Sequence, residues 1–75
     1  MSNIQLEHKI GMTVDEAAAY TSIGRNTLRF LINNEKLPVL RVGRRIIIRI
    51  DVLDRFLTKN QDINLLDLDK VMRIS

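Results

Sequence analysis

Apolar residues recur at helical spacing in three separate stretches of the chain. In the first, Val14 and Ala17 fall on one face. Thr13 and Glu16 fit a capping box, in which each side chain accepts a hydrogen bond from the other residue's backbone amide. We therefore expect a helix at about residues 14–20, with boundaries good to a few residues.

A second helix is predicted at residues 25–34, after a turn that ends in Gly24. Glycine permits an abrupt change of direction and is tolerated as an N-cap. Three residues at i, i+3 and i+4 form the stripe expected to be buried: Leu28, Leu31 and Ile32. The opposite side carries Asn26, Phe30 and Asn33, with Arg29 at its margin. This pattern predicts an amphipathic helix with a polar outer face.

Two short runs with strand character follow, at residues 39–42 and 45–50. They flank Gly43-Arg44, and a Gly-X pair between two such runs indicates a hairpin with a primed turn. Side chains alternate between the two faces of a strand. The face expected to cover the core carries Ile46, Ile48 and Ile50, and the outward face carries Arg45, Ile47 and Arg49.

A third helix is expected at residues 52–59, with Asp51 as its N-cap and an inward stripe of Leu53, Phe56 and Leu57. The order helix, turn, helix, hairpin, helix predicts one small α+β domain at residues 12–59. Residues 1–11 are interpreted as an N-terminal arm or a short strand. Residues 60–75 are acidic first and then apolar. This tail either packs locally or forms a partly disordered or helical segment that binds a partner.

Cationic residues are concentrated in residues 23–50. This stretch holds seven of the twelve Lys and Arg residues and a single acidic residue, Glu35, so its formal charge is +6 and the remainder of the chain is −3. The seven cations are Arg25, Arg29, Lys36, Arg41, Arg44, Arg45 and Arg49. A positive helix beside a positive hairpin favours binding to a polyanion with deep grooves, namely duplex DNA.

Other classes of function have little support in the composition. There is no cysteine, and a single histidine, His8, cannot build a zinc site alone. There is no Ser/His/Asp or Cys/His set and no glycine-rich phosphate loop, so we predict neither catalysis nor a cofactor or metal. The longest apolar run, residues 46–48, is far too short to span a membrane. Lack of cysteine and of a signal-peptide pattern favours a cytoplasmic protein.

The segments TVDEAA, SIGRNTLRFLI and KLPVLRVGRRIIIRIDVLDRFL resemble the excisionase-type, MerR-like winged helix-turn-helix family. That family typically shows T-x-x-E-A-A, then G-x-[IL]-P, then V-G-x-x-x-x-[IF]. The resemblance covers about residues 12–57. The first part, LEHKIGMTVDEAAAYTSIGRNTLRFLI, is similar to the excisionases of conjugative transposons. This implies a protein that binds and bends DNA near the ends of a mobile element and contacts a tyrosine-recombinase integrase.

The resemblance also implies which residues face DNA. The recognition helix falls on residues 25–34 and the tip of the hairpin, or wing, on residues 43–45. The candidate DNA-binding residues are Arg25, Asn26, Thr27, Arg29, Phe30, Asn33, Arg41, Arg44 and Arg45. For Arg44 and Arg45, the alternative is protection of a sheet edge against aggregation.

Two positions depart from the family pattern. Glu35 stands where the family usually has glycine, so either Glu35 is strained or Asn34 adopts the left-handed conformation. Phe30 stands where a polar or basic residue is usual. It either touches a thymine methyl group or packs on the wing.

Two other functions stay open at this point. A MerR-like or phage-type transcriptional regulator would use the same groove chemistry. A regulator of this type usually continues into a long dimerising helix, and we expect the end of this chain at Ser75 to favour the excisionase, which shapes the DNA. We also expect further copies of the chain on adjacent sites. In the second alternative, the tail makes the protein an interaction module and the basic face is only solvated.

Overall fold

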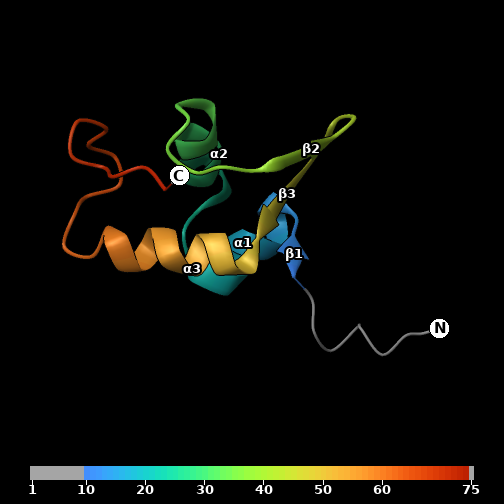
Figure 1. The fold of residues 1–75 in the computed structure, drawn as a ribbon, viewed down its shortest axis with the longest axis horizontal. Helices are drawn as coiled ribbons and strands as arrows, with labels where there is room; N and C mark the ends of the chain where they lie inside the picture. The colour runs from blue at the N-terminus through green and yellow to red at the C-terminus, as the bar shows by residue number, and fades with distance from the viewer. Residues whose placement is uncertain (1–9, 75) are drawn as a thin grey trace.

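The computed structural model describes residues 10–74 of the 75-residue chain. Residues 1–9 of the expected arm, including His8, lie outside the described residues. The elements are β1 (Gly11–Met12), α1 (Val14–Thr21), α2 (Arg25–Asn33), β2 (Leu40–Val42), β3 (Arg45–Arg49) and α3 (Ile50–Lys59). The expected α+β fold, a small winged helix-turn-helix, is confirmed (Figure 1).

The capping box predicted at the start of α1 is present. The Thr13 hydroxyl accepts the Glu16 amide at 3.1 Å, and the Glu16 carboxylate accepts the Thr13 amide at 3.0 Å. At the other end, Ser22 has a φ of +64° and donates its amide to Ala18 O. This left-handed residue stops the helix after two turns, so the chain redirects at once into α2.

The second helix ends in a Schellman motif centred on Glu35. The amides of Glu35 and Lys36 donate to Ile32 O at 3.0 Å and Leu31 O at 2.9 Å, and Glu35 has a φ of +59°. Glu35, and not Asn34, therefore occupies the left-handed position. The stripe predicted to be buried is buried: Leu28, Leu31 and Ile32.

The sheet has three antiparallel strands in the order β1-β3-β2. The hairpin of β2 and β3, residues 40–49, is called the wing, and its tip extends away from the helices (Figure 1). Gly43 is the first central residue of its two-residue turn and has a φ of +63°, as a type II′ turn requires. The sequence predicted the two strands of the hairpin and left open a short strand within residues 1–11. Strand β1, at Gly11–Met12, pairs Met12 with Ile48 and so covers one edge of β3.

The third helix begins earlier than the sequence predicts, and Asp51 as its N-cap is wrong. Arg49 is the N-cap and Ile50 the first helical residue, since β3 runs directly into α3. The Ile50 amide donates to Ile10 O at 2.9 Å. Because Ile10 directly precedes β1, this bond holds the junction of β3 and α3 against the start of β1. Asp51 lies in the first turn, where its carboxylate accepts the Val52 amide and favours the positive end of the helix dipole.

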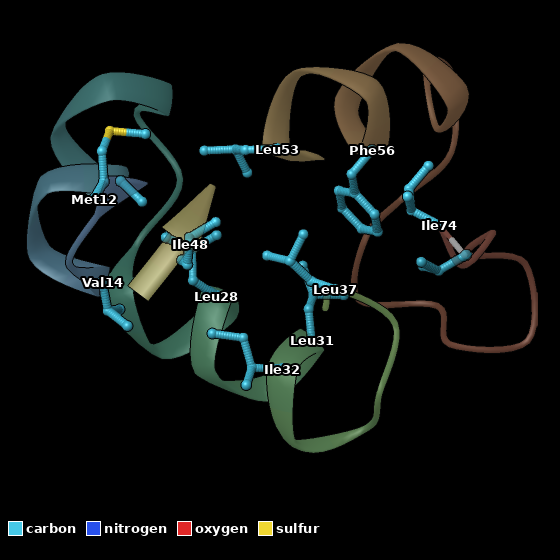
Figure 2. Packing of buried hydrophobic residues seen from close by; sticks show 12 residues of the cluster. Met12, Val14, Leu28, Leu31, Ile32, Leu37, Ile48, Leu53, Phe56 and Ile74 are labelled. Atoms are coloured by element: carbon cyan, nitrogen blue, oxygen red, sulfur yellow. The ribbon is translucent and has the colours of Figure 1, made fainter. Parts of the chain in front are cut away.

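The C-terminal segment, residues 60–74, packs on the domain without forming a helix, so a helical tail is wrong for these residues. Asn and Asp side chains offer the backbone an alternative to helical bonds, as where Asn64 Oδ1 accepts the Leu66 amide. Val71 and Ile74 join the buried core, and Figure 2 shows Ile74 beside Phe56 of α3. The described core comprises Met12, Val14, Ala17, Leu28, Leu31, Ile32, Leu37, Ile48, Leu53, Phe56, Val71 and Ile74.

Candidate nucleic-acid interface

A hollow of about 190 Å³ lies between the start of α1, the middle of α2 and the tip of the wing. Three arginines from two separate elements line it. Arg29 comes from the exposed side of α2, Arg44 from the turn of the wing and Arg45 from the first position of β3. The remaining lining residues are Thr13, Val14, Asp15 and Ile46. Three arginine residues therefore border one concave surface, and arginine suits an anion with several negative oxygens.

Arg25 is connected to the same hollow through Asp15. Its Nη1 lies 3.2 Å from Asp15 Oδ1, and the two side chains are 63% and 67% exposed. An ion pair this exposed is weak, because water and salt screen it. The Arg25 guanidinium can thus exchange Asp15, a residue that lines the hollow, for another anion.

The other predicted residues of α2 differ in exposure. Asn26 and Asn33 are exposed, and Thr27 is partly buried. Phe30 is also partly buried and packs against the core cluster. Only part of the Phe30 ring is left to reach outward. The ring packs on the core, whereas the sequence left open packing on the wing or contact with a thymine methyl group.

Arg49 is held away from this hollow. Its Nε and Nη2 donate to Asp51 Oδ1 and Oδ2 at 2.9 Å and 3.2 Å, a two-point contact. The hydrogen bond from Arg49 lowers the pKa of Asp51, and the same bond raises the pKa of Arg49. The outward position of Arg49 on β3 and this partner explain why not every cation of residues 23–50 points toward the arginine-lined hollow.

A second hollow, of about 240 Å³, lies where α2 leads into the wing. It contains Arg41, predicted from the sequence, and Arg73, which the sequence analysis missed. It is also lined by Ile32, Glu35, Leu37, Pro38 and Val39. The only sequence signal for Arg73 was its place between two apolar residues, Met72 and Ile74. That signal did not reveal where the tail lies.

Among residues 10–74, no group of three or more His, Cys, Asp or Glu residues could hold a metal ion. No helix in the same part of the chain is long and apolar enough to cross a membrane.

A family model described as a helix-turn-helix domain matches residues 12–61, two thirds of the chain. No curated protein and no solved structure matches the chain. The matched residues include α1, the turn, α2, the wing and α3, and they contain every residue that lines the two hollows except Arg73.

Proposed function

Because this chain belongs to the helix-turn-helix domain family, a family of DNA-binding domains, we propose that α2 is its recognition helix and lies in the major groove. The wing then follows the flanking backbone, with an arginine on a phosphate or in the minor groove. In this architecture the N-terminal part of the recognition helix reaches base edges. That part of α2 carries Arg25 and Asn26, and Arg29 follows at the middle of the helix.

The observation that carries this proposal is the convergence of Arg29, Arg44 and Arg45 on one hollow. An arginine fork can bind guanine O6 and N7, and an asparagine amide can bind adenine N6 and N7, each good pair contributing ~1–3 kcal/mol of discrimination. The wing arginines carry charge to the backbone, which supplies affinity without sequence information. Base reading and backbone binding are thus divided between α2 and the wing.

We further propose the biological role of an excisionase, or recombination directionality factor. The protein would bend DNA near the ends of a mobile element and assist a tyrosine-recombinase integrase. The resemblance of the segments around Met12–Leu57 to excisionases supports this role. Bending a site of ~20–30 bp by ~40–90° costs on the order of 1–6 kcal/mol. Contacts from the wing, or from further copies on adjacent sites, would offset that cost.

DNA binding is tested by fluorescence anisotropy on a labelled duplex from the flanks of the element, over a series of salt concentrations. If four to six cations neutralise phosphates, log K falls with log salt at a slope of roughly −4 to −5. Arg29→Ala and Arg44→Ala each make that slope shallower. Arg55→Ala is the matched control, because Arg55 is exposed on α3 and lies outside the first hollow. If all three variants lose the same DNA affinity, net charge, and not this surface, drives binding.

The excisionase role is tested by an excision reaction with purified integrase and a substrate that carries both element ends. We expect excision to require the protein and to be lost with Arg29→Ala but retained with Arg55→Ala. The bend is measured from the gel mobility of protein complexes with circularly permuted DNA fragments. Repression of a promoter without any effect on excision would identify a transcriptional regulator with the same fold instead.

A further inference from the structure

The C-terminal segment returns to the recognition helix. After α3 the chain turns back, and its last described residues lie beside α2 in Figure 1. The same proximity appears in the second hollow, whose lining joins Ile32 and Glu35 at the end of α2 with Arg73. A segment remote in sequence thus places a guanidinium at the C-terminal end of α2.

This segment is fixed to the body by a buried asparagine. Asn60 is 4% exposed, and its Nδ2 donates to Met72 O at 2.9 Å while its Oδ1 accepts the Met72 amide. Lys59 Nζ donates to Arg73 O at 3.3 Å. Val71 and Ile74, on either side, are buried in the core. The backbone that carries Arg73 is therefore preorganised, so ordering it costs little when a ligand binds.

Each hollow is lined by one residue from the same face of the wing. Arg41 of β2 stands directly opposite Ile46 of β3 in the sheet register. Residues directly opposite in an antiparallel pair project to the same face. Ile46 lines the first hollow with Arg29, and Arg41 lines the second with Ile32, one turn further along α2. The second hollow therefore continues the surface that faces DNA in the proposed function.

We propose that Arg41 and Arg73 form a second anion site, which binds a backbone phosphate of the duplex contacted by α2. The inference rests on the proposed function. Guanidinium groups from two elements can share one phosphate through paired N–H donors. Glu35 borders this site and weakens it by repulsion. The tail is then part of the DNA interface and is not an extension reserved for a protein partner.

The test compares Arg73→Ala with Lys70→Ala, a matched loss of one cation from the same tail. Lys70 is 75% exposed and lies 3.9 Å from Asp67. One lost phosphate contact makes the salt slope shallower by about 0.9, so a fourfold rise in salt weakens Arg73→Ala about 3.5-fold less than wild type. Lys70→Ala keeps the wild-type slope. Neither side chain is in the core, so both variants are expected to be as stable as the wild type. Their melting temperatures are measured to check this.

A double-mutant cycle tests whether Arg41 and Arg73 act on the same phosphate. In that case Arg41→Ala with Arg73→Ala loses less affinity than the product of the two single fold-losses. The inference is overturned if Arg73→Ala keeps the wild-type salt slope while Arg29→Ala does not. If Arg29→Ala also keeps it, the proposed function itself fails. Inorganic phosphate at constant ionic strength is added as a competitor of DNA. If phosphate weakens DNA binding by the wild type but not by Arg73→Ala, the result supports the site.

Discussion

Glu35 is held in a backbone conformation that its side chain disfavours, and replacing it with glycine should stabilise the domain. Its φ of +59° lies in the left-handed region, and the two amide bonds of the Schellman motif keep it there. A residue with a Cβ atom loses about 1–2 kcal/mol in that conformation. Glycine, the usual residue of the motif, avoids this cost.

The expected gain is smaller than the strain because glycine also stabilises the unfolded chain. Greater freedom in the unfolded state subtracts roughly 0.4–1 kcal/mol. Glu35 is exposed and takes part in no ion pair among residues 10–74, so little else is lost. The net gain in the free energy of unfolding is then about 0.5–1 kcal/mol. For a domain of this size that raises the melting temperature by about 2–8 °C.

The assay is thermal unfolding followed by circular dichroism for wild type, Glu35→Gly and Glu35→Ala. Alanine removes the same charge but keeps the Cβ atom, so it isolates the conformational contribution. We expect the glycine variant to melt above both other proteins. If glycine and alanine give the same melting temperature, any gain comes from removing a negative charge, and the reasoning from backbone strain is refuted.

Three further predictions concern packing and charge elsewhere in the domain. Asn60→Ala should cost about 1–3 kcal/mol in urea unfolding, since it leaves the partly buried amide and carbonyl of Met72 without their side-chain partner; an unchanged midpoint would contradict this. A Cβ on Gly11 would lie 2.7 Å from Ile47 Cγ2, so Gly11→Ala should cost roughly 1–3 kcal/mol, and the cost should shrink when measured in an Ile47→Ala background. Arg49 lowers the pKa of Asp51, so this pair stabilises the fold above the ordinary aspartate pKa of about 4, and that stability is lost as pH falls further. Asp51→Asn should therefore flatten the acid side of the stability curve, and an unaltered acid limb would count against the pair.

Elements with local causes were predictable from the sequence. The capping box joins residues three apart, the buried stripe of α2 repeats at helical spacing, and Gly43 meets the demand of its own turn. The strained position at Glu35 was foreseen as one of two options by comparison with the usual glycine. Each of these features depends on a few consecutive residues, so neighbouring residues carry enough information.

Features with distant causes were missed. The start of α3 depends on β1, whose preceding residue accepts the Ile50 amide across the sheet. The packing of residues 60–74 depends on a bond from Asn60 to a backbone twelve residues away. The spacing of apolar residues in the tail is compatible with a helix and equally with an irregular segment that packs on the core. Choosing between them requires knowing which core surface is left to cover.

The candidate DNA-binding residues Arg25, Arg29, Arg44 and Arg45 were chosen from the sequence, and whether they bind DNA stays a prediction. The chain alone determined that positive charge would concentrate on one helix and one hairpin, because composition and periodicity are properties of the sequence itself. Only the tertiary structure decided that Arg29 and the wing arginines border one hollow, that Arg49 is held by Asp51, and that Arg73 lies beside the end of α2. The physical reason is that the relative placement of elements is set by the shared core, in which residues from every segment must pack together.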